Sequence, residues 1–155
     1  TYVRPLLKYN TTVWSPSLVG PITALEGVQR NFTKRLIGFD GLSYAERLTK
    51  SNLQSLEHRR LMSDLIACFN IVHGYSALCF NDFFSFSHNP FSRGHPLRLA
   101  IPLSKTNTDK HFFSNRVVIP WNSLPADLVT TTCPKSFKNQ LGKINLSKFL
   151  IFPTK

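Results

Sequence analysis

The chain has 155 residues, which is enough for one domain, or one and a half, with a substantial core. Its 42% apolar and 17% charged content excludes the disordered class, which combines high charge with few aromatic residues. Basic residues outnumber acidic residues by 19 to 8, and the resulting net charge of +11 favours a polyanionic partner, nucleic acid first. A generic basic surface is the alternative.

The first predicted helix lies between a proline and a glycine. Residues 2–14 are β-branched and aromatic, so we expect extended chain or the tail of a helix there. Pro21 suits the first turn of a helix that runs to about Ile37, and Gly38 suits its end. One face of this helix carries apolar residues at steps of three and four. They are Leu25, Val28, Phe32 and Leu36, with Ile22 beside them.

Two further helices are predicted from their capping residues. Ser43 and Glu46 form a capping-box pattern, which predicts a helix over about 44–50. Ser55 is suited to cap a longer helix over about 56–73. Apolar residues cover well over half of that helix's circumference, so we expect it to be buried on more than one side and to form the central helix.

The second half of the sequence is richer in loop residues. We expect a helical turn over 81–84, a loop over 85–94, a short strand over 97–101, a loop over 106–110, and helices over 112–124 and 135–145. Pro120 should disturb the last turn of the first of these two helices. In the final helix, Phe137, Leu141 and Ile144 should face inward. Lys135, Lys138 and Lys143 should face outward.

Together these elements predict a mainly α-helical fold. Residues 1–16 are expected to continue a longer chain, because an apolar, aromatic run is already under way at residue 2. Residues 17–75 form a three-helix module, and residues 76–155 form a mixed, loop-rich module with at most a short β-hairpin.

The sequence offers no pattern for catalysis or for a metal site. Polymerases and nucleases gather two or three carboxylates around divalent metal, yet no two of the 8 acidic residues are adjacent. Glu46 and Glu57 stand at helix starts, where capping explains them. The 5 histidines lack ligand spacing. We therefore expect no catalytic residue, metal or cofactor in this chain, which is not an enzyme on its own.

The cysteines and the hydropathy pattern bear on compartment. Cys68, Cys79 and Cys133 include no close pair, so neither a disulfide framework nor a zinc finger is expected, and Cys68 suits a buried position. No apolar run approaches the roughly 20 residues of a membrane span, and nothing resembles a targeting peptide. We expect an intracellular protein without a membrane partner, with nucleus and cytoplasm both open.

Basic groups interleaved with aromatic rings are the positive signal for function. Phe91–Arg98 presents basic side chains in a glycine-containing loop, and Phe112–Arg116 places an arginine next to two rings. Such groups make salt-dependent, sequence-neutral contacts with phosphates. The candidate nucleic-acid-binding residues are Arg30, Lys34, Arg35, Arg93, His95, Arg98, Arg116 and Lys138. The alternative is that the rings lie in the core and the arginines are solvated or paired with acids.

A series of short segments carries a family resemblance in order through nearly the whole chain. The segments are Tyr2–Asn10, Val13–Pro16, Val28–Leu36, Leu42–Leu48, Leu53–Leu61, Asp64–Leu65, Ile71–Gly74, Arg93–Leu97, Phe112–Val118, Trp121–Pro125 and Ser136–Phe137. In order and spacing they resemble the region after the polymerase domain in jockey-like LINE (non-long-terminal-repeat) retrotransposon reverse transcriptases.

The resemblance implies a C-terminal piece of an RNA-directed DNA polymerase. Residues 1–16 would close the polymerase domain. The helices after residue 16 would be thumb-like and would hold the template-primer nucleic acid, an RNA/DNA hybrid or template RNA. The upstream polymerase domain of the same polypeptide would be the second partner. Neither the family's paired aspartates nor its endonuclease has a counterpart here.

Two alternatives to nucleic-acid binding stay open. The chain is either a structural packing platform for a missing polymerase domain, with an exposed apolar strip at residues 2–14, or a domesticated host protein that binds an acidic protein partner.

Overall fold

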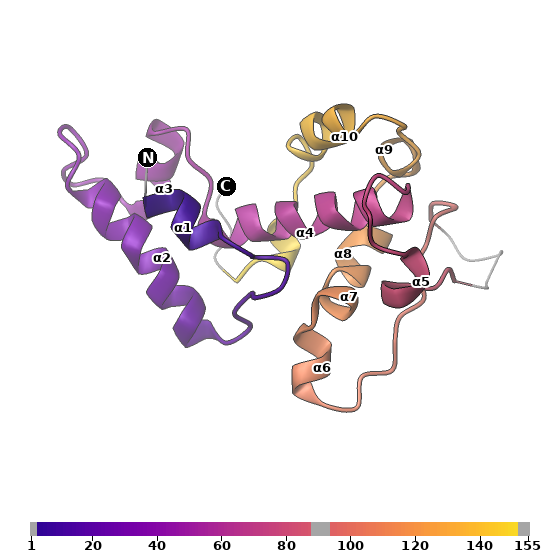
Figure 1. The fold of residues 1–155 in the computed structure, drawn as a ribbon. Coiled ribbons are helices and arrows are strands. Elements are labelled where there is room, and N and C mark those ends of the chain that lie inside the picture. Colours follow the sequence, from indigo (N-terminus) through magenta and orange to yellow (C-terminus); the bar gives the residue numbers. More distant parts are fainter. Residues whose placement is uncertain (1–2, 88–93, 152–155) are drawn as a thin grey trace. The chain divides into compact units, whose positions relative to one another are not determined.

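The computed structural model describes residues 3–87 and 94–151. Over these residues the chain is mainly α-helical, as predicted, and contains no named strand. The chain divides into two compact units, residues 1–61 with 145–155 and residues 62–144. This division differs from the predicted boundaries after residues 16 and 75, because it falls inside helix α4 (Leu56–Val72; Figure 1).

The first unit contains three short or medium helices before α4. They are α1 (Val3–Lys8), α2 (Val19–Lys34) and α3 (Tyr44–Lys50), and the 3-10 helix η1 (Ser147–Phe149) joins them from the other end of the chain. Turns follow α1, so the segment expected to be extended or a helix tail is a short helix with a folded exit. Arg60 holds this segment, because its guanidinium donates a hydrogen bond to the carbonyl oxygen of Leu7 at 2.9 Å.

The predicted caps of α3 and α4 are confirmed. The Ser43 hydroxyl accepts from the Glu46 N–H at 3.3 Å, and the Glu46 carboxylate accepts from the Ser43 N–H at 2.7 Å. The Ser55 hydroxyl accepts from the His58 N–H at 3.2 Å in the first turn of α4. Gly74 follows the end of α4 with a φ of +72°, a conformation that glycine adopts without strain.

Helix α2 buries a different face from the one that its apolar pattern suggests. It begins two residues before Pro21 and ends before Arg35. Its buried residues are Ile22, Glu26, Gln29 and Thr33. By contrast, the side chains of Val28 and Phe32 are 42% and 61% exposed. The side that packs into the unit is therefore mostly polar, and the apolar side faces outward.

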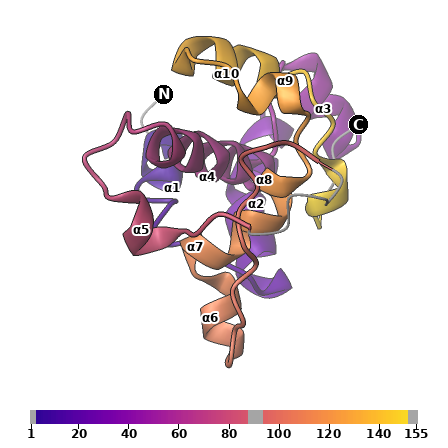
Figure 2. The ribbon, with the colours of Figure 1, turned by 90° about the vertical axis from the view of Figure 1, so that its right-hand side faces the viewer.

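The second unit is built around the remainder of α4. It contains α5 (Phe80–Phe83), α6 (Asn107–His111), α7 (Phe113–Arg116), α8 (Val118–Asn122), α9 (Ala126–Val129) and α10 (Pro134–Leu141). Figures 1 and 2 both show this part of α4 between α10 on one side and α7–α8 on the other. The Phe69 ring stacks on Phe137 with centroids 4.1 Å apart, and Trp121 is fully buried. Within this unit α4 is the central helix, as predicted.

Three predicted segments of the second unit take a different form. The helix expected over 112–124 is divided at Val117 into α7 and α8, so Pro120 lies in the first turn of α8, where its missing N–H costs no helical hydrogen bond. The expected strand contributes a single antiparallel bridge between Phe86 and Leu99. The loop expected over 106–110 contains α6, which Thr106 and Asp109 cap.

Candidate nucleic-acid interface

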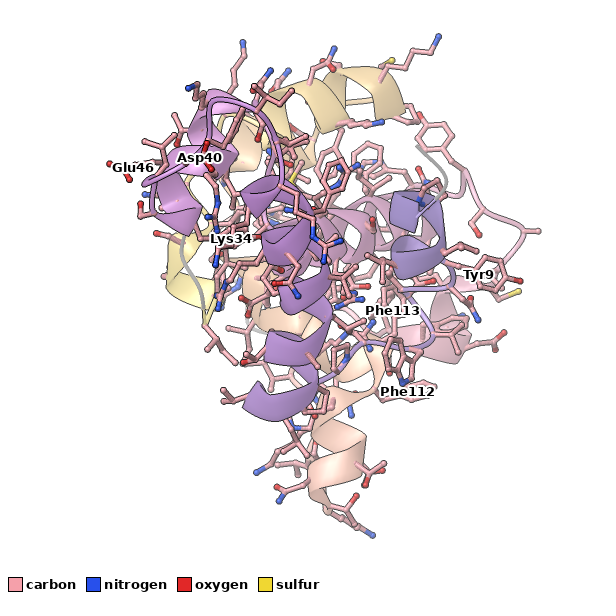
Figure 3. The ribbon with its side chains drawn as sticks, turned by 90° about the vertical axis from the view of Figure 1, so that its left-hand side faces the viewer. Tyr9, Lys34, Asp40, Glu46, Phe112 and Phe113 are labelled. Atoms are coloured by element: carbon pink, nitrogen blue, oxygen red, sulfur yellow. The ribbon has the colours of Figure 1, made fainter. Side chains whose placement is uncertain are left out.

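The C-terminal end of α2 presents exposed cations in the first unit. Lys34 and Arg35 are both exposed, and Figure 3 shows Lys34 near this end of the helix, with Asp40 and Glu46 beyond it. Lys50 of α3 lies in the same unit and donates to the carbonyl oxygen of Gly38 at 2.6 Å. These groups form the α2 basic surface, which we define as Lys34, Arg35 and Lys50.

A buried hydrogen-bond network removes the acidic charge of α2 from its surface. Glu26 is the acidic residue of α2, and its side chain is only 1% exposed. Its carboxylate accepts from the Leu56 N–H at 2.9 Å, at the start of α4, and from the hydroxyl of Tyr44. Gln29 donates to the carbonyl oxygen of Gln54 at 2.9 Å. The carboxylate thus stabilises the N-terminus of α4, and its charge does not lie at the exposed surface of α2.

The same network engages the predicted phosphate contact Arg30. Its guanidinium lies 5.0 Å from the centre of the Tyr44 ring, a cation–π arrangement, and the side chain is half-buried. Burial and the hydrogen bond to Glu26 raise the pKa of the Tyr44 hydroxyl well above its ordinary value. Tyr44 therefore remains a neutral hydroxyl donor to Glu26, and Arg30 packs against its ring.

Helix α10 carries the basic surface of the second unit. Phe137 and Leu141 are buried on its inner side, whereas Lys135 and Lys138 are exposed, as is Lys143 just beyond its end. The inward Phe137 and Leu141 and the outward lysines are as predicted, whereas Ile144 lies beyond the end of the helix and is half-buried. The sequence contains no acidic residue after Asp127. We define Lys135, Lys138 and Lys143 as the α10 basic surface.

The thiol of Cys133 lies at the N-cap of α10 and is exposed. The backbone N–H groups of Ser136 and Lys135 at the start of α10 lower the pKa of this thiol, and the positive charge of Lys135 adds to the effect. Burial instead raises the pKa of the Cys68 thiol, inside α4. The local field at the start of α10 therefore favours a negative charge.

Arg116 is held by an acidic residue of its own unit. Its guanidinium donates two hydrogen bonds to the carboxylate of Asp64, at 2.9 and 3.0 Å, and a third to the carbonyl oxygen of His111 at 2.9 Å. Such a bidentate pair fixes the guanidinium plane against α4. Arg116 therefore ties α7 to α4, which agrees with the salt-bridged alternative considered for it from the sequence.

The remaining predicted residues come from the loop before Leu99. His95 is 3% exposed, and its Nε2 lies 3.1 Å from the carbonyl oxygen of Trp121. Burial lowers the pKa of this imidazole, so it is neutral at pH 7. Arg98 is half-buried and packs against Gly94, where an added Cβ would lie 3.0 Å from its Cδ. Arg93 lies outside the described residues.

The structure thus gathers few of the predicted contacts at a surface. Lys34 and Arg35 lie together at the end of α2. Lys138 lies with Lys135 and Lys143, which were predicted to face outward but are not among the predicted nucleic-acid contacts. Among the described residues, no group of His, Cys, Asp or Glu side chains could hold a metal ion. No helix in residues 3–87 and 94–151 combines the length and the apolar character that crossing a bilayer requires.

Comparisons with known proteins give one partial similarity. A stretch of 76 residues is 33% identical to an uncharacterized protein of Caenorhabditis elegans. The match covers 47% of this chain and 38% of that protein, so the chain spans well under half of the relative's length. The sequence matches no protein-family profile. No solved structure is similar to the chain.

Proposed function

We propose that this chain binds the sugar-phosphate backbone of nucleic acid through the α2 and α10 basic surfaces. The observation that carries the proposal is that the α2 basic surface exposes two lysines and an arginine and the α10 basic surface exposes three lysines, while the acidic residue of α2 is buried and none follows Asp127. Phosphate binding needs exposed cations, which both surfaces supply. Arg30, His95 and Arg116 serve the fold in this proposal.

The resemblance to LINE-type reverse transcriptases gives this binding a context. In that context the chain is a C-terminal segment of an RNA-directed DNA polymerase, and the ligand is the template-primer, an RNA/DNA hybrid. The upstream polymerase domain carries the chemistry, and this segment contributes no catalytic residue or cofactor. The order of the matching segments and the net charge of +11 support the proposal.

The test is a binding titration with a labelled RNA/DNA hybrid across a series of salt concentrations. Each phosphate neutralised contributes about 0.9 to the slope of log K against log salt for duplex DNA. Replacing Lys135, Lys138 and Lys143 together by Gln should therefore reduce the magnitude of the slope by about 2 to 3. The double variant Lys34→Gln, Arg35→Gln should reduce it by about 1 to 2.

A matched control removes exposed lysines elsewhere in the second unit. Lys105 precedes α6, Lys110 lies in it, and both are exposed, so Lys105→Gln with Lys110→Gln changes the net charge without touching either basic surface. The control should leave most of the slope intact. Equal losses in all three variants would mean that only net charge matters, and binding without a salt slope would refute the proposal.

The exposed apolar residues of the first unit support a second candidate, the packing platform. Leu6, Tyr9, Val13 and Trp14 are all exposed around and after α1. A surface of this kind is typical of a contact with another domain. Sedimentation velocity tests it, because an uncovered platform should self-associate as concentration rises, and replacement of Tyr9 and Val13 by Ser should suppress that association.

A further inference from the structure

An apolar stripe follows the exposed side of α2 with the spacing of a coiled-coil seam. Its members are separated by steps of three, four, three and four residues, which places them on one side of a helix. They are Leu18, Pro21, Leu25, Val28 and Phe32, and we call this set the α2 seam. None of the five is buried. The side chain of Phe32 is 61% exposed and that of Val28 is 42% exposed.

The first unit does not need this seam for its own interior. The side of α2 that packs inward consists of Ile22, Glu26, Gln29 and Thr33. Hydrogen bonds from Gln29 to Gln54 and from Leu56 to Glu26 fix that side against the segment that leads into α4. The seam is therefore an ordered apolar ridge on a helix that other contacts already hold in place.

The charges around the seam indicate what could cover it. Arg35 occupies the next seam position, three residues after Phe32, and is exposed. Glu26 is buried, so α2 shows no carboxylate at its surface, and Figure 3 shows Asp40 and Glu46 beyond the end of the helix. A partner that follows the seam to its end thus meets a guanidinium, which pairs best with a carboxylate.

We propose that the α2 seam binds an amphipathic α-helix of another protein, whose apolar ridge packs on Leu25, Val28 and Phe32 and whose carboxylate pairs with Arg35. A helix is the occupant because ridges at three- and four-residue steps interlock with another helix. A second copy of this chain fits less well, because the α2 surface of that copy has no exposed carboxylate to pair with Arg35. Aliphatic members such as Leu25 and Val28 offer nucleobases no stacking surface. This inference does not depend on nucleic-acid binding.

The probe is a designed helical peptide titrated against the full chain. The peptide carries leucines at three- and four-residue steps and glutamates on the flanks, and is long enough to follow all of α2. A scrambled peptide of the same composition has no leucine ridge, and a third peptide has lysines in place of the glutamates. We expect saturable binding of the first peptide alone, measured by fluorescence anisotropy.

Two substitutions locate the site, and a third is the control. Phe32→Ala should weaken binding of the acidic peptide about tenfold or more, as expected for an aromatic residue at the centre of an interface. Phe112→Ala is the matched control, because Phe112 is 59% exposed but belongs to the second unit, and it should leave binding unchanged. Arg35→Glu should weaken the acidic peptide and restore binding of the lysine peptide. Circular dichroism confirms that each variant keeps its helices.

Several outcomes would overturn the proposal. If the chain bound the scrambled peptide as tightly as the leucine-ridge peptide, charge attraction alone would explain binding and the α2 seam would have no role. A concentration-dependent dimer of the wild-type chain that Phe32→Ala abolishes would assign the seam to a second copy. Phe32→Ala variants that lose affinity for the RNA/DNA hybrid but not for the peptide would assign it to nucleic acid instead.

Discussion

At the scale of single residues, the most consequential side chain of the first unit is a buried acid. Glu26 brings together three segments, because its carboxylate contacts the start of α4 and the hydroxyl of α3's Tyr44. Buried carboxylates are tolerated where their hydrogen bonds are all satisfied, and costly to disturb for the same reason. The sequence contains nothing local that marks Glu26, since both partners lie far along the chain.

The first prediction concerns this carboxylate. Glu26→Gln should lower the free energy of unfolding by about 2 kcal/mol or more, because the amide N–H₂ donates and cannot replace an accepting carboxylate oxygen, and the charged acceptor is lost. Urea unfolding followed by circular dichroism measures the change. Asp40→Asn, at an exposed position, should change it by less than about 0.5 kcal/mol. Equal effects of the two substitutions would contradict the assigned role of Glu26.

A second prediction at this scale follows from His95. Its buried imidazole has a lowered pKa, with Arg98 nearby, whereas in the unfolded chain the pKa is near 6.5. As the pH falls below 6.5 the unfolded state binds a proton before the folded state does. The free energy of unfolding therefore has its full value above that pH and decreases below it. His58 shifts in the same direction and adds to the decrease.

Urea midpoints at pH 7.5 and 5.5 measure this dependence. The variant His95→Gln keeps a side-chain donor for the Trp121 carbonyl oxygen but cannot titrate, so it should lose less stability on acidification than the wild type. An identical pH dependence in the two proteins would remove His95 as a cause and leave His58 as the remaining histidine with a lowered pKa among the described residues.

At the scale of elements, local signals predicted helices well and the buried sides less well. The caps at Ser43 and Ser55 and the apolar arc of α4 were sufficient to place α3 and α4, because a cap depends on residues within one turn. The buried side of α2 was not predictable, since periodicity reveals an apolar side but not whether the fold covers it. The role of Arg116 in the candidate site was not predictable from local sequence either, because its partner Asp64 is 52 residues away.

The third prediction uses Pro120 to test whether residues 112–124 are divided into two helices. If residues 112–124 formed one continuous helix, Pro120→Ala would stabilise the protein by about 3 kcal/mol, the usual cost of an interior proline. Because Pro120 stands in the first turn of α8 and is buried, we expect no stabilisation and a loss of about 1 kcal/mol from the lost packing. Thermal and urea unfolding distinguish these opposite signs.

At the scale of the whole molecule, charge is the dominant property. The 19 basic residues are spread over both units, and the chain carries a net charge of +11. Self-repulsion of this kind destabilises a compact state and is screened by salt. The sequence predicted this property completely, because net charge needs no knowledge of contacts.

The fourth prediction follows from that repulsion. Raising the NaCl concentration from low to moderate values should raise the thermal midpoint of the free protein, because screening relieves repulsion in the folded state. Replacing Lys135, Lys138 and Lys143 by Gln takes the net charge from +11 to +8 and should make the rise smaller. A midpoint that falls with salt would show that attractive ion pairs outweigh the repulsion.

The position of Cys133 has a practical consequence for following this protein in solution. Its thiol is exposed and has a lowered pKa, whereas the Cys68 thiol is buried and has a raised one. Near neutral pH, iodoacetamide should therefore alkylate Cys133 well before Cys68, which peptide mass spectrometry can time. In a Cys79→Ser background, a maleimide dye would then attach at one known point beside the α10 lysines. Its emission would report ligand arrival at that surface directly.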